Sequence, residues 1–154
     1  MGGLQMEAEW RGSSILVVDD TPKVVAALEA LYGQLGLEVV GHAVNGVDAL
    51  AKIKQLKPDI VSMDIIMPEM DGIECYRKIR DGEKPAPKVF FMTYLATEPK
   101  VLEVYRDEIP EFLFVAKNYS QDSVRTVLNR LYEPHAAIPP KPPAPPKEDG
   151  PSVV

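Results

Sequence analysis

The amino-acid sequence predicts an α/β fold, namely a doubly wound parallel sheet of five strands with five helices. Five short runs of apolar residues alternate along the chain with five amphipathic segments. Strands that are apolar throughout are buried on both faces, as they are in parallel sheets between two layers of helices. Because crossovers between parallel strands are right-handed, a doubly wound sheet is the simplest arrangement of these elements.

Each predicted strand is long enough to be a buried strand and too short to be a helix. The strands are expected at residues 15–18, 37–43, 60–63, 89–92 and 112–115. The first helix should begin at Thr21-Pro22, since proline is tolerated in the first turn, and the third should begin at Asp71. The second helix is expected to carry Val47, Leu50, Ile53 and Leu56 on one face, and the fourth should span about residues 98–106.

Composition narrows the class of protein. The chain has 154 residues, 45% of them apolar, which is enough for one domain with a core. A net charge of −6 without a basic block argues against nucleic-acid binding. The single cysteine, Cys75, excludes an internal disulfide and fits a reducing compartment. Neither a membrane-spanning run nor a signal peptide is recognisable, so we expect a cytoplasmic protein.

Three regions are expected along the chain: a flexible N-terminal arm (1–13), a folded domain (14–132) and a Pro-rich tail (133–154). The last 21 residues contain eight prolines and few large apolar side chains, a composition that favours extended polyproline II. The tail is therefore either a disordered end or a segment whose residues 139–146 dock on an aromatic groove of a partner protein.

Five polar side chains follow the ends of the predicted strands. Asp19 and Asp20 follow the first strand, Asp64 the third, Thr93 the fourth and Lys117 the fifth. Ligands of open parallel sheets bind beyond these carboxyl ends. If the first and third strands are neighbours, the three carboxylates converge and repel one another unless a cation neutralises them, and Mg²⁺ prefers such hard oxygen ligands. With a hydroxyl and an ammonium beside them, the carboxylates form an acceptor site for a phosphoryl group.

These residues carry a resemblance to a known family. With the stretch DIIMPEMDG from Asp64 to Gly72, they match, in the correct order, the receiver domain of bacterial two-component response regulators over residues 14 to 132. The resemblance implies the flavodoxin-like fold with strand order 2-1-3-4-5. It also implies phosphorylation of Asp64 by a sensor histidine kinase or a phosphotransfer protein.

The resemblance further assigns roles around Asp64. Asp20, Asp64 and the backbone carbonyl of Ile66 would hold Mg²⁺ directly, and Asp19 would act mainly through water.

Signalling roles follow from the same resemblance. Thr93 and Phe114 would form the switch pair, and Lys117 would contact the phosphate.

Two positions depart from the family pattern. Asn118 follows Lys117 where the family usually has proline, so we expect a trans peptide bond there. Tyr94 follows Thr93 where a small residue is usual. Tyr94 and Ile66 could gate the path of water to the acyl phosphate and so prolong its life. Alternatively, Tyr94 points outward and serves a partner surface.

The sequence thus predicts a phosphorylation-controlled signalling module without an output domain, not an enzyme beyond the turnover of its own phosphate. It would act through protein contacts as a monomer or a weak homodimer. A second hypothesis is a receiver-like interaction module that does not signal by phosphate, which Tyr94 and Asn118 support. A third, a Mg²⁺-dependent phosphatase, is disfavoured because no second carboxylate lies two residues after Asp64.

Overall fold

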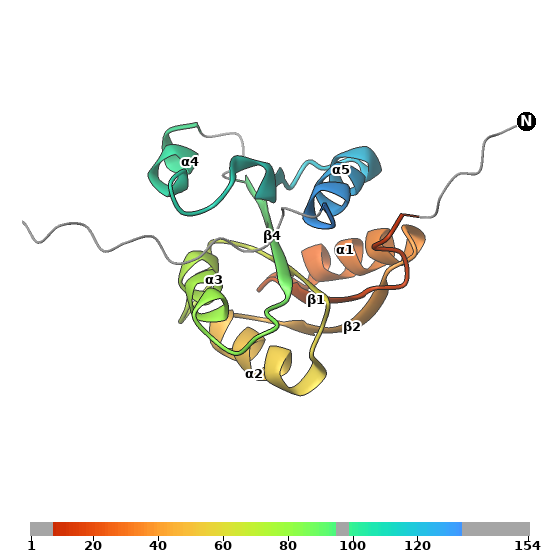
Figure 1. The fold of residues 1–154 in the computed structure, drawn as a ribbon, viewed down its shortest axis with the longest axis horizontal. Helices are drawn as coiled ribbons and strands as arrows, with labels where there is room; N and C mark the ends of the chain where they lie inside the picture. Colours follow the sequence, from red (N-terminus) through yellow and green to blue (C-terminus); the bar gives the residue numbers. More distant parts are fainter. Residues whose placement is uncertain (1–7, 95–98, 134–154) are drawn as a thin grey trace, which may run out of the picture.

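A computed structural model describes residues 8–94 and 99–133 (Figure 1). Five parallel strands form one sheet in the order β2-β1-β3-β4-β5, which confirms the predicted fold and strand order. The strands are β1 (Ser14–Val18), β2 (Glu38–Ala43), β3 (Ile60–Met63), β4 (Lys88–Thr93) and β5 (Phe114–Ala116).

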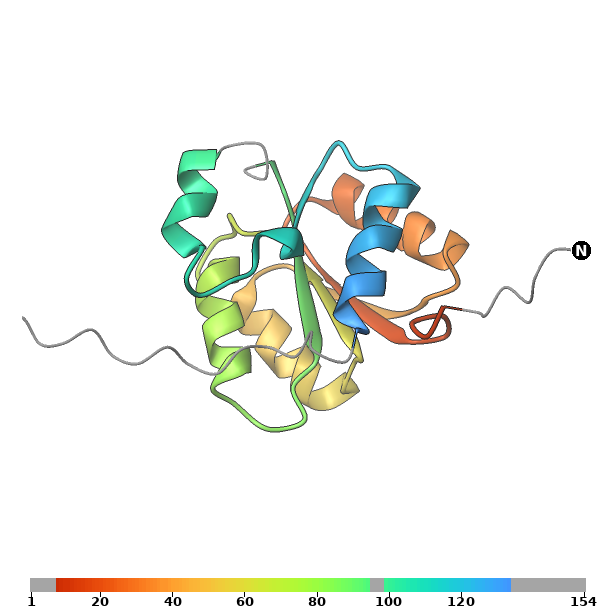
Figure 2. The same ribbon diagram turned by 45° about the horizontal axis from the view of Figure 1, so that its top comes forward.

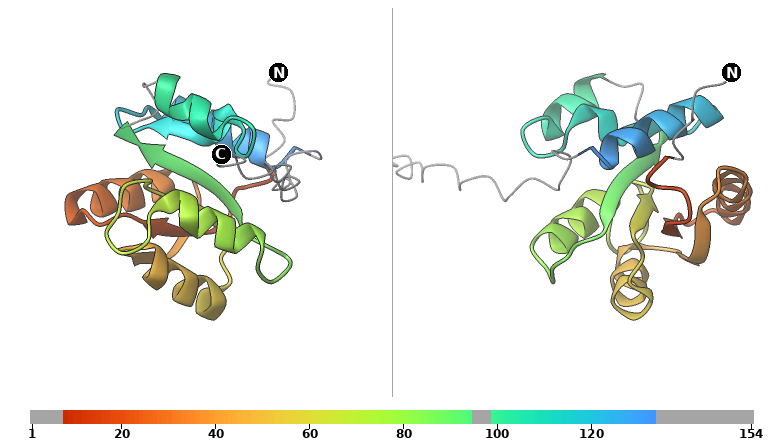
Figure 3. Two further views of the ribbon diagram at one scale, coloured as in Figure 1. Left: turned by 90° about the vertical axis from the view of Figure 1, so that its left-hand side faces the viewer. Right: turned by 45° about the vertical axis from the view of Figure 1, so that its right-hand side comes forward.

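The helices cover both faces of this sheet. They are α1 (Pro22–Gln34), α2 (Gly46–Leu56), α3 (Gly72–Arg80), α4 (Pro99–Tyr105) and α5 (Gln121–Leu131), with a short 3₁₀ turn, η2 (Glu111–Leu113). Helices α1 and α5 lie on one face and α2 and α3 on the other, while α4 lies toward the β4–β5 side (Figures 1, 2 and 3). The three central strands are therefore buried between two helix layers, as their apolar sequences predict.

Local sequence explains where several helices begin. Asn45 accepts a hydrogen bond from the backbone N–H of Asp48, and Asp71 accepts one from that of Glu74, each at 2.8 Å. Such caps satisfy backbone donors that lack a partner within the helix. The first helix has Pro22 in its first turn, as predicted. The third begins just after the cap at Asp71, which confirms the predicted start.

One boundary of the predicted elements is wrong. The fifth strand begins at Phe114, because the preceding residues, 111–113, form the 3₁₀ turn η2 after Pro110. The apolar run there resembles a strand only in composition. In α2 the fully buried positions are Gly46 and Ala49, whereas Val47 and Leu56 are exposed.

The N-terminal arm also differs from the prediction. Residues 1–7 lie outside the described residues, but residues 8–13 pack against the domain. Trp10 is buried, and its indole Nε1 donates a hydrogen bond to Asn129 Oδ1 at 2.7 Å. The backbone N–H of Gly12 donates to the carbonyl of Gly36. A buried indole with a satisfied N–H anchors this segment onto α5.

The Pro-rich tail, 134–154, lies outside the described residues. Within the described part of the chain, no helix combines the length and apolar character that a bilayer crossing requires. Cys75 is fully buried on α3, as expected for a small apolar side chain.

Candidate phosphoacceptor site

Backbone hydrogen bonds bring the predicted site residues to one edge of the sheet, which we call the carboxyl edge. The N–H of Asp64 donates to the carbonyl of Val18 at 2.9 Å, just beyond β3 and β1. The N–H of Lys117 donates to the carbonyl of Thr93 at 3.2 Å, just beyond β5 and β4. The sheet ladder therefore continues one residue past these strand ends and fixes where the side chains start.

Three carboxylates meet at this edge. Asp19, Asp20 and Asp64 each offer an oxygen, and these three oxygens lie within 4.8 Å of one another. Asp19 and Asp64 are buried, with 1% and 7% of their surfaces exposed, whereas Asp20 faces solvent. The site is thus open on the side of Asp20, where a small ion or a phosphoryl group can enter.

One ammonium group lies between the two buried carboxylates. Lys117 Nζ donates a hydrogen bond to Asp64 Oδ2 at 2.9 Å and forms an ion pair with Asp19 Oδ2 at the same distance. Its side chain is only 5% exposed. The bond between Lys117 and Asn118 is trans, as predicted, since among the described residues the cis bonds are limited to Lys84–Pro85. Lys117 therefore reaches the site without a proline after it.

Burial sets the charge balance of this cluster. Burial is the main reason that the pKa of Asp64 is raised; Lys117 lowers it, and Asp19 raises it further. Burial also opposes the charge of Lys117, but Asp64 and Asp19 outweigh it and raise the pKa of Lys117 above its ordinary value. Lys117 thus stays charged, while Asp64 ionises less readily than an exposed aspartate.

The cluster fits a divalent cation. Three carboxylates and one ammonium leave a formal charge of −2 when all are ionised. Among the described residues, no donor meets the buried Asp19 Oδ2 with hydrogen-bond geometry, although Lys117 is close by. A buried carboxylate oxygen without a hydrogen bond and an excess of negative charge are both features that Mg²⁺ would satisfy.

The loop after β3 folds back over Asp64. Gly72 donates its backbone N–H to the carbonyl of Ile65 at 2.7 Å. A Cβ at position 72 would lie 2.1 Å from the carbonyl oxygen of Asp64, so only glycine fits this close approach. The Asp71-Gly72 pair of the sequence motif therefore caps α3 and closes the loop over the site.

Thr93 and Phe114, the predicted switch pair, are both buried, and Phe114 faces inward. The ring of Phe114 stacks on Phe91 with centroids 5.2 Å apart, and Phe91 in turn contacts Tyr76 of α3. Sequence reasoning missed these two partners. An aromatic residue in an apolar strand is typical of any core, so only the fold shows that these rings connect α3 to Phe114.

Tyr94 and Ile66, the predicted gate residues, lie at the rim. The ring centroid of Tyr94 is 4.9 Å from Lys117 Nζ, a cation–π contact, although 72% of Tyr94 is exposed. Ile66 is 65% exposed. The structure thus brings Tyr94 into contact with a residue of the site, and both side chains also meet solvent.

Comparison with known proteins identifies the family of this chain. Residues 15–129 match the sequence profile described as response regulator receiver domain. The chain belongs to the response regulator receiver domain family. As a receiver domain it is 34% identical over 120 residues to the chemotaxis protein CheY of Thermotoga maritima, which covers 78% of this chain and 98% of that protein.

Other relatives are larger than this receiver domain. A protein-glutamate methylesterase/protein-glutamine glutaminase of Nocardioides sp. is 51% identical over 85 residues, which is 53% of this chain and only 23% of that protein. The similarity to the methylesterase therefore concerns a fraction of its length.

Solved structures agree with the receiver fold. A chain of the CheX–CheY–BeF₃–Mg²⁺ complex from Borrelia burgdorferi matches with a TM-score of 0.67 and 25% identity, over 80% of this chain and 96% of that chain. The response regulator domain of Thermotoga maritima CheB matches with a TM-score of 0.61 and 28% identity, over 77% and 98%.

Proposed function

We propose that this receiver domain accepts a phosphoryl group on Asp64 and signals through protein contacts. The observation that carries the proposal is the position of Lys117, whose ammonium is 2.9 Å from both buried carboxylates at the carboxyl edge. Such an ammonium balances the charge of an incoming phosphoryl group. Similarity to CheY proteins supports the same function.

The proposed reaction is a phosphoryl transfer to Asp64. A carboxylate oxygen of Asp64 attacks the phosphorus of a phosphohistidine on a sensor kinase or a phosphotransfer protein. A P–O bond forms, the P–N bond breaks, and its electron pair stays on the imidazole. Lys117 compensates the negative charge that the phosphoryl oxygens bring into the site, and the loop closed by Gly72 holds Asp64 in place.

A Mg²⁺ ion would be held by Asp20, Asp64 and the backbone carbonyl of Ile66, with Asp19 acting through water. Such an ion would supply positive charge to offset that of the phosphoryl oxygens. The chain's contribution is the cluster of carboxylates, whose formal excess charge equals that of one divalent cation.

Thr93 and Phe114 are proposed to report the phosphorylated state to a partner. Thr93 lies at the site, and Phe114 packs on Phe91 at 5.2 Å. A hydroxyl drawn toward the phosphate would leave space behind it, which a neighbouring ring could fill. The downstream partner is proposed to be a protein, as in the CheX–CheY complex.

Phosphorylation by acetyl phosphate tests this function. The wild type is expected to gain a phosphoryl group in Mg²⁺, detected by intact mass or by gel retardation, and Asp64→Asn should gain none. Asp122→Asn changes an exposed carboxylate on α5 and should be labelled like the wild type. Labelling of the Asp64→Asn variant at the wild-type level would refute the assignment.

Tyr94 is proposed to prolong the phosphorylated state. Its ring lies 4.9 Å from Lys117 Nζ, and beside a phosphoryl group on Asp64 it would narrow the approach of water to the phosphorus. Tyr94→Ala is therefore expected to hydrolyse its phosphate about tenfold faster, a barrier change of about 1.4 kcal/mol. Equal phosphate half-lives of Tyr94→Ala and wild type at saturating Mg²⁺ would contradict the gate.

A further inference from the structure

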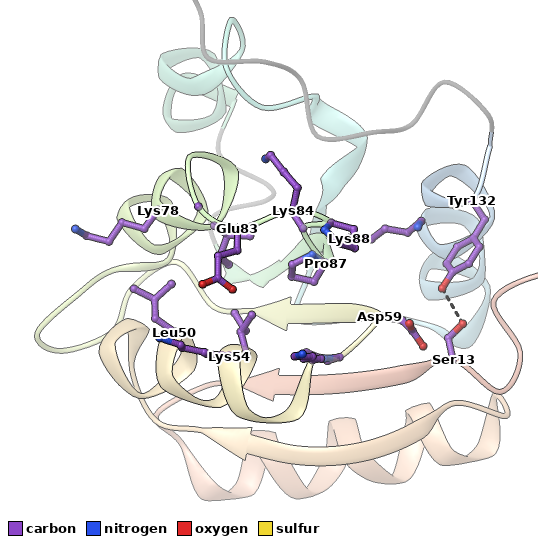
Figure 4. Close-up of a pocket in the computed structure, with 17 residues that line it drawn as sticks. Ser13, Leu50, Lys54, Asp59, Lys78, Glu83, Lys84, Pro87, Lys88 and Tyr132 are labelled. Carbon is purple, nitrogen blue, oxygen red and sulfur yellow. Dashed lines mark hydrogen bonds between the residues drawn. The ribbon is translucent and has the colours of Figure 1, made fainter.

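A second concave site lies at the opposite end of the sheet, which we call the amino edge. It is a cavity of about 680 Å³ bounded by the end of α2, the end of α3 and the loop before β4 (Figure 4). Ser13, Asp59 and Lys88 mark it as the edge where β1, β3 and β4 begin. Small-molecule sites in proteins have volumes of roughly 300–1,000 Å³.

The floor of this cavity is apolar. Helix α2 contributes Leu50 and Ile53, α3 contributes Ile79, and the loops contribute Pro58 and Pro87. Leu50 and Ile53 are only partly buried against the core, and both also line the cavity.

The rim is basic in a chain whose net charge is −6. The lysines that line the cavity outnumber its acidic residues, and they are Lys54, Lys57, Lys78, Lys84 and Lys88. Lys84 donates to the carbonyl of Arg80, and Lys88 lies over the ring of Tyr132. Within the described ranges 8–94 and 99–133, the ammonium groups of Lys54 and Lys57 have no hydrogen-bond or ion-pair partner, although the backbone N–H of Lys57 donates to the carbonyl of Ile53.

Lys57 has an unusual backbone for a lysine. It is the residue after α2 and adopts the left-handed conformation, with φ 49° and ψ 56°. Glycine or asparagine occupies such a position at lower steric cost. The unfavourable conformation is explained if the ammonium group on the cavity rim has a role of its own.

Two effects oppose an anion here. The carboxyl ends of α2 and α3 carry partial negative charge, which lysines near helix ends commonly compensate. Of the two acidic residues, Asp59 is held by the backbone N–H and hydroxyl of Ser14. Glu83 remains, and Figure 4 shows its carboxylate opposite Leu50 and Lys54. An anionic ligand that also carries hydrogen-bond donors would satisfy both the lysines and Glu83.

We propose that this cavity binds an organic phosphate of nucleoside diphosphate size. Its phosphates would meet Lys54 and Lys57, its flat body would lie on the apolar floor, and its N–H or O–H donors would face Glu83. Lysine ammoniums suit phosphate as point charges. A peptide bound by strand pairing is disfavoured, because β1, β3 and β4 are interior strands and offer no open edge for a peptide backbone to pair with.

Titration of the full chain with ADP tests the proposal, followed by amide chemical shifts and by calorimetry. EDTA is present, so that Mg²⁺ cannot bring the phosphates to the carboxyl edge. ADP is expected to shift the amides of residues 54–57 and of the non-proline residues among 82–88, and to bind at least tenfold more tightly than pyrophosphate or adenosine. Shifts elsewhere, no shifts at millimolar ADP, or pyrophosphate binding as tight as that of ADP would overturn the site.

Charge removal sharpens the test. The double variant Lys54→Gln/Lys57→Asn should bind ADP at least tenfold more weakly, and asparagine suits the left-handed backbone, so the fold is kept. Lys100→Gln, an exposed lysine on α4, is the matched control and should bind like the wild type. The double variant should still be labelled on Asp64 by acetyl phosphate, so the two sites can fail separately. Unchanged ADP affinity of the double variant would refute the role of the lysines.

Discussion

The carboxyl edge and the loop after α4 each hold a cluster of charged side chains, but the two clusters differ in charge balance. The carboxyl edge has excess negative charge, whereas Arg77 and Arg80 are balanced by Glu108 and Asp81. At the carboxyl edge, three carboxylates lie together, and the ammonium of Lys117 pairs with two of them, Asp19 and Asp64. After α4, Glu108 is held by two guanidinium groups. Arg77 binds both of its oxygens at 2.8 Å, and Arg80 binds Oε2 at 2.7 Å. We call this group the Glu108 clamp.

The two carboxylates respond in opposite directions to their surroundings. The pKa of Glu108 is lowered, chiefly by its hydrogen bond from Arg77 and then by Arg80, although burial opposes the shift. The pKa of Asp64 is raised, because burial outweighs the hydrogen bond from Lys117. Glu108 is thus satisfied within the protein, whereas Asp64 is not.

This difference separates a structural cluster from a functional one. The Glu108 clamp ties the loop after α4 to α3 with charge-assisted hydrogen bonds that need nothing further. The carboxyl edge keeps unbalanced negative charge in a buried place, which costs stability unless a cation binds. Perturbed carboxylates of this second kind are the ones expected at functional sites.

Removal of Lys117 should have the largest effect on stability. Lys117→Met leaves Asp19 and Asp64 buried side by side without a counter-charge, and we expect it to lower the free energy of unfolding by about 3 kcal/mol without Mg²⁺. Urea denaturation in EDTA measures this loss. Addition of Mg²⁺ should recover part of it, since the cation replaces the missing charge.

A double variant checks the cause of that loss. If repulsion between the carboxylates is responsible, Lys117→Met/Asp64→Asn should be more stable than Lys117→Met alone. A double variant no more stable than the single one would mean that lost packing of the lysine stem, and not charge, explains the effect.

Opening the Glu108 clamp should have a smaller effect. Glu108→Gln removes charge-assisted bonds to Arg77 and Arg80 and should cost about 2 kcal/mol at pH 7. A lowered pKa means that the stabilisation exists above the unfolded value of 4.5 and is lost as the pH falls through the folded value. Denaturation at pH 7 and pH 3 should therefore show a difference at pH 7 that shrinks at pH 3.

Glu103→Gln, on the exposed surface of α4, is the matched control and should not change stability at either pH. A loss in Glu108→Gln that persists unchanged at pH 3 would contradict an ionic clamp.

The sequence alone predicts the carboxyl edge well, because its residues follow strand ends. In parallel strands those ends meet at one edge, so Asp19, Asp64 and Lys117 can be placed together without coordinates. The order of the strands came from the family resemblance. The inward position of Phe114 could not be predicted, because an aromatic residue in an apolar run fits a core and a switch equally well.

The features that the sequence did not predict depend on loops and on packing of distant segments. Glu108 meets Arg77 across 31 residues, and Trp10 meets Asn129 across 119. No periodic pattern links such residues. The cavity at the amino edge likewise forms only where two helix ends and a proline-containing loop converge. The left-handed backbone of Lys57 is not indicated by any sequence motif.

The smallest expected effect is a gain in stability at Asp64 itself. Asp64→Asn removes a buried charge that the protein does not fully compensate, so we expect a rise in unfolding free energy on the order of 1 kcal/mol at pH 7 without Mg²⁺. Because the pKa of Asp64 is raised by folding, the folded wild type binds this proton more tightly than the unfolded chain does. The wild type therefore gains stability as the pH falls through the folded pKa toward the ordinary value of 3.8.

The stability advantage of Asp64→Asn should thus be full at neutral pH and should vanish near and below pH 3.8. The two carboxylates have effects of opposite sign, because ionised Asp64 destabilises the folded wild type whereas ionised Glu108 stabilises it above pH 4.5. Urea denaturation of both proteins in EDTA between pH 3 and pH 8 measures it. Saturating Mg²⁺ should reverse the order at neutral pH, because the cation binds the wild-type carboxylate and not the amide. An Asp64→Asn variant less stable than the wild type in EDTA at pH 7 would show that Asp64 is compensated within the protein, as Glu108 is.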